Sequence, residues 1–269
     1  MEKISKYVAS LESLSKTASI VECNNCGSKT LANGAVSICN FCELAVMSNM
    51  EHTSNAELFK GISILIDKGM IAEALSSLND LSKSISDPIS VYIIGVFYEF
   101  ISNYKYNDIN YSRAGFMEEN SSNIYSSLDM ISKAKEQYFK TLSLISKATS
   151  KGSDTLYLEF ITNIKLKRSF NAKLCLKELN SHKTGESYNA YSNMIYATIS
   201  KNKNIELFIN PVIKRGEVNV FYYIAKYFAE NKKIEDAVLL LSELITVARM
   251  PMAFYLLKKV KNVHAAMEI

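Results

Sequence analysis

Four of the five cysteines in the chain lie within residues 21–46, where they form two C-x-x-C pairs. Cys23 and Cys26 make the first pair, and Cys39 and Cys42 make the second. Two cysteines separated by two residues turn both sulfurs toward one point, and two such turns complete a tetrahedral site of four sulfurs. A closed site of this kind is typical of structural zinc, so the spacing predicts one structural Zn²⁺.

The main alternative for paired cysteines is a disulfide or a redox-active pair. Glu2, Lys3, Lys6 and Glu12 stand where a signal peptide would need an apolar segment, so we expect no export and a cytoplasmic location. Stable disulfides are rare in the cytoplasm, and two C-x-x-C pairs there favour a metal site.

The residues between the two pairs predict how the pairs meet. Gly27, directly after the first pair, has the permissive backbone that a metal-binding turn often needs. Asn33-Gly34 is a strong signal for a tight type I′ turn, so we expect residues 29–32 and 35–38 to pair as one hairpin. That hairpin would return the second cysteine pair to the first.

This stretch resembles a zinc ribbon of the rubredoxin-like kind. The resemblance is carried by Cys23, Cys26, Gly27, Cys39 and Cys42, and it implies that the four cysteines are the metal ligands. The chain departs from the family where many ribbons have a proline inside a knuckle or a second glycine. Those places hold Asn24, Asn40 and Glu43.

No further pattern in the sequence predicts catalysis. The glycine-rich phosphate loop, the dinucleotide-binding fingerprint and G-x-S-x-G are all absent. The histidines, His52, His182 and His264, are far apart and lie in no metal-protease or nucleophile motif. Cys175 lies between two leucines and is expected to pack as a small buried hydrophobe. We therefore predict that the protein is not an enzyme.

The strongest electrostatic feature is a basic group formed by Lys165, Lys167, Arg168, Lys173 and Lys177. At about 100° per residue, all but Lys167 fall within roughly half of a helix circumference. Such a face is usually only solvated, but it could also contact an acidic protein surface or nucleic acid. The ribbon is poorly equipped for nucleic acid, because Lys29 is the only cation in residues 21–46.

The composition predicts a folded, mainly α-helical protein. Of its 269 residues, 48% are hydrophobic, and only nine are glycine and three proline. No stretch approaches the roughly 18 apolar residues of a membrane span, so we expect no membrane insertion. Residues 1–20 predict an amphipathic helix, with Ile4, Tyr7 and Leu11 at helical spacing, packed on the ribbon or on the helices that follow it.

An internal repeat appears when residues 58–81 are aligned with residues 221–244. The shared positions are an acidic residue followed by alanine and later by proline: Glu73, Ala74 and Pro88 in the first copy, and Asp236, Ala237 and Pro251 in the second. The pattern resembles the tetratricopeptide repeat, although the usual aromatic and glycine positions of its first helix hold other residues. The resemblance implies an α-solenoid of stacked helical hairpins that offers an extended binding surface.

Other periodic segments predict the remaining helices. They span residues 56–68, 70–85, 88–102, 124–148, 154–179 with a break near Ser169, 187–199, a segment starting at Asn210-Pro211, and 252–263. Residues 103–123 are polar and are expected to form a loop, either a mobile connection or a partner-binding segment.

The predicted organisation has three parts: an N-terminal helix (1–20), a zinc ribbon (21–50) and a helical-repeat domain (51–269) with its own core. Because solenoids offer surface but no reaction chemistry, we expect a scaffold or adaptor that binds a protein partner, with the ribbon as a rigid docking element. The alternative is a nucleic-acid-associated or regulatory factor that uses the basic region 151–217.

Overall fold

The computed structural model describes residues 2–33, 36–47, 55–103, 127–182, 186–248, 250, 253–254 and 256–261. In this part of the chain one helix precedes four short strands, ten helices follow as far as Ala248, and residues 253–254 and 256–261 are helical as well. The expectation of a mainly helical protein with a small β region near its N-terminus is therefore confirmed. No helix among these residues is long and apolar enough to cross a membrane.

The elements follow the chain in this order. The N-terminal part holds α1 (Glu2–Thr17), β1 (Ser19–Glu22), β2 (Lys29–Ala32), β3 (Val36–Ile38) and β4 (Ala45–Met47). The first helices after it are α2 (Ala56–Asp67), α3 (Ile71–Ser84), α4 (Pro88–Asn103), α5 (Ser127–Ser146) and α6 (Ser153–Lys165). The last are α7 (Ser169–Ser181), α8 (Glu186–Ile199), α9 (Glu206–Lys214), α10 (Val220–Glu230) and α11 (Ile234–Ala248).

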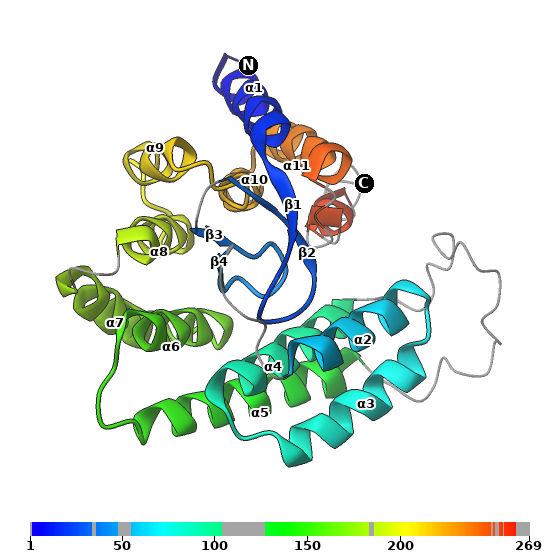
Figure 1. Ribbon diagram of the computed structural model, residues 1–269. Helices are drawn as coiled ribbons and strands as arrows, with labels where there is room; N and C mark the ends of the chain where they lie inside the picture. The colour runs from blue at the N-terminus through cyan, green and yellow to red at the C-terminus, as the bar shows by residue number, and fades with distance from the viewer. Residues whose placement is uncertain are drawn as a thin grey trace.

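The helices α2 to α11 curve around the strands, which lie at the centre of the molecule (Figure 1). Each helix packs against the next along the chain, and α1 packs against α11. We expected α1 to pack on the ribbon or on the first helices after it. Asn33 of the ribbon does contact the end of α1, but the helix that α1 packs against is α11 and not one of the first helices. Ile4, Tyr7 and Leu11 form its buried face as predicted, but Tyr7 lies against Phe228 of α10, with ring centroids 6.1 Å apart.

The strands form two separate antiparallel hairpins. β1 pairs with β2, with Glu22 opposite Lys29, and β3 pairs with β4, with Ile38 opposite Ala45. The predicted pairing of residues 29–32 with 35–38 is therefore wrong, because each of these strands has its hydrogen-bonded partner across a cysteine turn. The side-chain amide of Asn33, which follows β2, donates a hydrogen bond to the carbonyl of Leu14 at the end of α1.

Five helices end in the same turn. After α2, α6, α8, α9 and α10 one residue has positive φ, and the next N–H bonds back to the last helical turn, which is the Schellman arrangement. The positive-φ residues are Gly69, Lys167, Lys201, Gly216 and Lys232. The predicted breaks near Gly69 and Ser169 are confirmed. The start predicted at Asn210-Pro211 is wrong, since α9 begins at Glu206 and Pro211 lies inside it.

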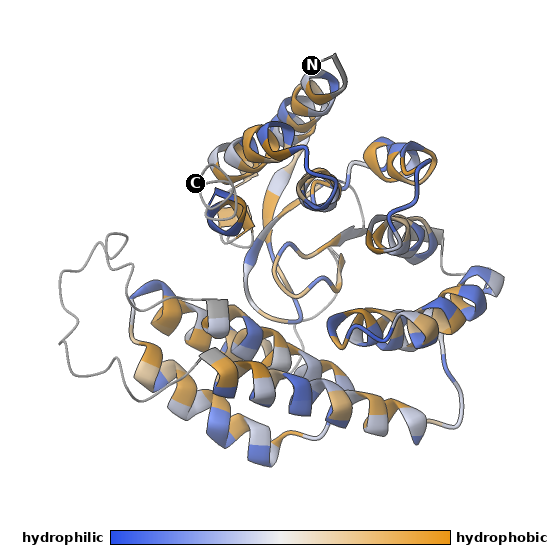
Figure 2. Ribbon diagram, turned by 180° about the vertical axis from the view of Figure 1, so that it is seen from behind, coloured by the Kyte–Doolittle hydropathy of each residue, from blue (hydrophilic) through white to orange (hydrophobic). Residues whose placement is uncertain are grey.

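Helices and strands share one hydrophobic core. Cys23, Cys39 and Phe41 of the ribbon belong to the same buried cluster as Phe97 of α4 and Tyr223 of α10. The expectation that the helical region has a core of its own is therefore wrong. Hydrophobic and hydrophilic residues alternate along the helices of the arc, as amphipathic helices require (Figure 2).

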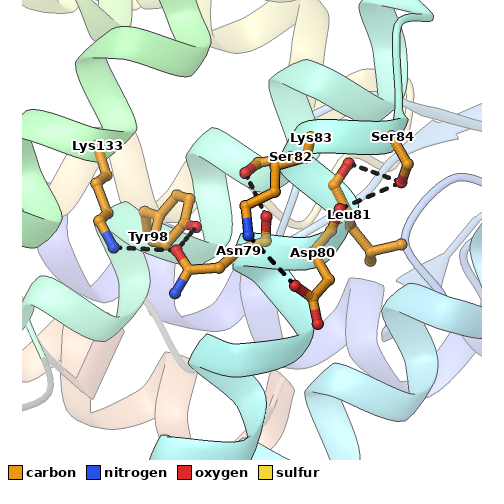
Figure 3. A network of polar contacts seen from close by, with 8 residues as sticks. All are labelled: Asn79, Asp80, Leu81, Ser82, Lys83, Ser84, Tyr98 and Lys133. Atoms are coloured by element: carbon orange, nitrogen blue, oxygen red, sulfur yellow. Dashed lines mark hydrogen bonds and ion pairs between the residues drawn. The ribbon is translucent and has the colours of Figure 1, made fainter.

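A polar network joins α3, α4 and α5. Asn79 of α3 accepts hydrogen bonds from the Tyr98 hydroxyl (2.8 Å) and from Lys133 Nζ (3.0 Å), and the Lys133 ammonium also lies 5.6 Å from the Tyr98 ring centroid (Figure 3). The start of α4 is capped as predicted, since Asp87 accepts from the Ser90 N–H at 2.8 Å. Residues 104–126, nearly all of the predicted polar loop at 103–123, lie outside the described residues.

Ala74 and Ala237 are completely buried in α3 and α11, each of which packs against the preceding helix. A leucine at either position would force the helices apart, so Ala74→Leu and Ala237→Leu should each lower the free energy of unfolding by about 1–3 kcal/mol. Chemical denaturation measures the change. Ala72→Leu is the matched control, because Ala72 is exposed on α3; equal stability of all three variants would contradict the close approach.

Candidate metal centre and the helices that enclose it

Each C-x-x-C pair occupies the turn of one hairpin, and the two turns have the same hydrogen bonds. The Cys23 N–H donates to the Ser28 carbonyl at 2.8 Å, and the Cys39 N–H donates to the Leu44 carbonyl at 2.8 Å. The fifth residue of each turn then donates back to the first cysteine, Gly27 at 2.8 Å and Glu43 at 3.1 Å. The predicted return of the second pair to the first is therefore achieved by two matching turns.

The four sulfurs converge on one point. All four cysteines are fully buried free thiols, and their Sγ atoms lie within 4.8 Å of one another. Cys23 and Cys42 are 3.8 Å apart, and Cys26 and Cys39 are 3.7 Å apart. A tetrahedral ion with metal–sulfur bonds of about 2.3 Å places its ligand sulfurs about 3.8 Å apart. The cluster therefore fits a tetrahedral metal ion.

Hydrogen bonds support the sulfurs as ligands. The backbone N–H of Asn25 lies 3.4 Å from Cys23 Sγ, and that of Phe41 lies 3.4 Å from Cys39 Sγ. The Ser28 hydroxyl lies 3.0 Å from Cys26 Sγ and 3.3 Å from Cys39 Sγ. Burial raises the pKa values of Cys26 and Cys42 well above the usual value. Burial opposes ionisation of Cys39 as well, but hydrogen bonds from the other thiols and from Ser28 outweigh it and hold the pKa of Cys39 well below the usual value. Such contacts orient thiolate ligands and stabilise their charge.

The two turns differ at their fifth residue. Gly27 has φ +71°, and a Cβ there would lie 2.5 Å from Lys60 Cβ, so the first turn is pressed directly against α2. Glu43 occupies the matching place in the second turn with φ +61°, a conformation that is costly for a residue with a side chain. The contacts made by the Glu43 side chain help to compensate this backbone cost.

The Glu43 carboxylate is held between α6 and α10. Lys165 Nζ lies 2.9 Å from its Oε2, and the Tyr223 hydroxyl donates to its Oε1. The Tyr157 hydroxyl also donates to the Glu43 carbonyl at 2.7 Å. Lys165 in addition lies 3.3 Å from Glu99 of α4, so one buried lysine links the ribbon to two helices.

The pKa shifts agree with this geometry. Burial alone would lower the pKa of Lys165, but Glu43 and Glu99 outweigh it and raise the pKa. Burial alone would raise the pKa of Glu99, but Lys165 and the Tyr138 hydroxyl, which donates at 2.7 Å, lower it. Lys165 and Glu99 are therefore charged at neutral pH, and breaking the cluster would leave a buried charge without its partner.

Other contacts tie the ribbon to the rest of the arc. The Ile38 N–H donates to the Glu217 carboxylate at 3.0 Å, and Asn219 donates to the Ile38 carbonyl at 2.9 Å. Burial raises the pKa of Glu217 to about 7 despite that hydrogen bond. Phe41 packs on two aromatic rings of α4, Phe97 and Phe100, with centroids 4.9 and 5.3 Å away. The second cysteine turn and β3 are thus enclosed by the helices, whereas Ile20 of β1 is 66% exposed.

The structure divides the predicted basic group. Lys165 is turned inward and paired, so it does not belong to a solvated face. Lys167 and Arg168 lie in the turn between α6 and α7, and Lys173 and Lys177 are exposed on α7. The prediction of a single basic helix face is therefore wrong, because α6 ends at Lys165 and a new helix, α7, begins at Ser169. The sequence contains one sign of this arrangement: an acid, Glu43, at the place of a turn glycine.

Among the described residues, neither Cys175 nor His182 belongs to the cysteine cluster. Cys175 is buried in α7, where its thiol lies 3.8 Å from the Asn163 amide, as expected for a packed cysteine. Burial raises its pKa to about 12, so the thiol stays protonated. His182 follows the end of α7. His52 and His264 lie outside the described residues.

We expect purified protein to contain one metal ion per chain, and Cys39→Ser to lose it. Because the cysteines belong to the common core, loss of the ion should lower the midpoint of helix unfolding as well as disorder the ribbon. Elemental analysis and thermal circular dichroism measure the two effects. Cys175→Ser is the control and should keep the ion. A metal-free Cys39→Ser protein whose helices melt at the wild-type temperature would refute the shared core.

Removing the Glu43 charge should destabilise the protein strongly. Glu43→Gln leaves Lys165 buried with only Glu99 to compensate it, so the free energy of unfolding should fall by about 3 kcal/mol, measured by denaturant titration. Asp80→Asn is the control, because Asp80 pairs with Lys83 at 3.5 Å on the exposed surface. That change should cost less than about 0.5 kcal/mol. Equal effects of both substitutions would show that the buried cluster contributes nothing special.

Comparison of the chain with protein-family models, with curated proteins and with solved structures finds no match in any of the three. The geometry of the site itself shows a buried cluster of four cysteines that is compatible with a bound metal ion.

Proposed function

We propose that the protein is a non-enzymatic, cytoplasmic interaction module whose helices are organised around one structural Zn²⁺. Zinc is favoured because four thiolates form a closed tetrahedral set, with no open position for a substrate. A reducing compartment suits the protein, because all five cysteines are free thiols.

We further propose that the arc is an α-solenoid built from tetratricopeptide-like helix pairs. The aligned segments both form a helix, a turn with one positive-φ residue and a second helix: α2 and α3 around Gly69, and α10 and α11 around Lys232. Ile71 and Ile234, which the alignment pairs, each begin the second helix. Ala74 and Ala237 occupy the same buried place in it.

One observation supports a partner-binding surface on the outside of α7. Phe170 is 73% exposed and Leu174 is 51% exposed, although the opposite face of the same helix is buried through Ala172, Cys175, Leu176 and Leu179. Phe170, Lys173, Leu174 and Lys177 recur at three- and four-residue spacing, so they form one outward stripe. We call these four residues the α7 stripe. Two exposed apolar side chains, Phe170 and Leu174, beside the cations Lys173 and Lys177 are typical of a surface that binds a protein.

The charges suggest the chemistry of the partner. Lys167, Arg168, Lys173 and Lys177 are exposed, and none of them forms an ion pair with a carboxylate in the part of the chain described above. A partner segment with apolar side chains flanked by Asp or Glu would complement the α7 stripe. We therefore propose an acidic amphipathic helix or peptide as the ligand.

Substitutions on the α7 stripe test this function. Tagged protein purified from its native host should retain a protein partner that Phe170→Ala/Leu174→Ala loses, with at least about tenfold weaker binding of that isolated partner, as expected when central apolar anchors are removed. Leu128→Ala is the matched control, since Leu128 is 76% exposed on α5. Unchanged metal content would show that the fold is intact.

Nucleic-acid binding through region 151–217 is the competing outcome of the same experiment. Its signature would be co-purified DNA or RNA, with binding that persists at physiological salt and is lost in Lys173→Glu/Lys177→Glu. That result, or a partner retained equally by the wild type and by Phe170→Ala/Leu174→Ala, would overturn the proposed function.

A further inference from the structure

A cavity of about 390 Å³ lies between the ribbon and the helices that enclose it. The ribbon contributes Asn40, Phe41 and Glu43 to its wall, and residues of α4, α6, α8 and α10 contribute most of the remainder. Lys167, Ser169 and Glu230 also line it and are exposed to solvent, so they mark its rim. Its volume is within the range of small-ligand sites in proteins.

The charges that line the cavity are balanced in number but separated in space. Glu43 and Glu99 share the single lysine Lys165, so this inner group has a net negative charge. The rim and the α10 wall carry Lys167 and Lys226, and neither forms an ion pair with a described carboxylate. Lys226 nevertheless lies near enough to Glu99 to help lower the pKa of that carboxyl. Glu230 is the only carboxylate among the exposed rim residues named above.

Asn40, on the inner wall, has a polar atom that no described residue satisfies. Asn40 is only 6% exposed, and its Oδ1 has no hydrogen-bond donor among the described residues. Glu43 Oε2 is also buried, and Lys165 Nζ lies 2.9 Å from it as its partner. A buried acceptor such as Asn40 Oδ1 is normally satisfied, so it indicates a donor supplied from elsewhere. Tyr222 and Tyr223 add aromatic surface beside both acceptors, which attracts ammonium groups.

We infer that the cavity binds a small zwitterion, a free α-amino acid or a dipeptide. Its ammonium group donates hydrogen bonds to the Asn40 and Glu43 acceptors beside the tyrosine rings. Its carboxylate lies toward Lys226 and Lys167. The ammonium of a zwitterion pairs with the net negative group of Glu43, Glu99 and Lys165, and its carboxylate pairs with Lys226 and Lys167. A simple cation would pair only with the first group, and a simple anion only with the two lysines. This site is independent of the α7 stripe.

Methyl NMR of the full-length, metal-loaded protein tests the inference. Met250 lines the cavity and is 4% exposed, so its ¹³C-labelled methyl group reports on occupancy, and the other methionines serve as references. The probes are an equimolar mixture of the standard free amino acids and a mixture of Gly-X dipeptides, at millimolar concentration. Single compounds from an active mixture are then compared with their amides and their N-acetyl derivatives. We expect Met250 to shift with the free zwitterions, and each blocked form to bind about tenfold more weakly.

Lys226→Gln separates this site from general surface binding. It should weaken the zwitterion about tenfold and bring its affinity to that of the corresponding amide, because the carboxylate loses its cation. Lys177→Gln, outside the cavity on α7, should leave the affinity unchanged. A Met250 signal that no mixture moves would overturn the inference. The inference would also be overturned if the amides and N-acetyl derivatives bound as tightly as the free zwitterions, or if Lys226→Gln left zwitterion binding unchanged.

Discussion

The burial of four converging sulfurs inside an arc of helices is the constraint on which this structure depends. Two hairpins with strands of three or four residues cannot enclose a core of their own. The cysteines are inaccessible, and the turns that hold them lie against four helices: Gly27 against α2, Phe41 against α4, and Glu43 against α6 and α10. Neither part has a complete hydrophobic core without the other. A metal ion here would act as a cross-link at the centre of the whole fold.

Local sequence signals predicted the local structure well. The cysteine spacing gives the convergent sulfurs, Gly69 marks the turn after α2, and Asp87 with Pro88 marks the start of α4. These features depend on a few neighbouring residues, which is why they can be read along the chain. The three lysines with positive φ after α6, α8 and α10 were not predicted as turn residues, because lysine carries no turn preference.

Long-range relations could not be read in the same way. Lys165 belongs by spacing to a basic helix face, but the turn at Lys167 and the distant Glu43 direct it inward. The pairing of β1 with β2 likewise depends on the cysteine turn between them, which outweighs the turn signal at Asn33-Gly34. An acid at a left-handed position next to a metal ligand was the visible anomaly, and its explanation lies more than a hundred residues away, in α6 and α10. Strain at such a position is retained when tertiary contacts compensate it.

The contact between α1 and α11 has a consequence for how the protein is made. During synthesis the ribbon leaves the ribosome long before the helices that cover it, so its thiols stay open to the cellular metal pool while most of the arc is still being translated. Closure has to wait for the last helices, because α1 packs against α10 and α11, which emerge after the other helices of the arc. Contacts between such distant parts of a chain slow folding. Once closed, the same arrangement would make metal exchange depend on opening the arc, so an ion bound at the four cysteines would be acquired early and released slowly.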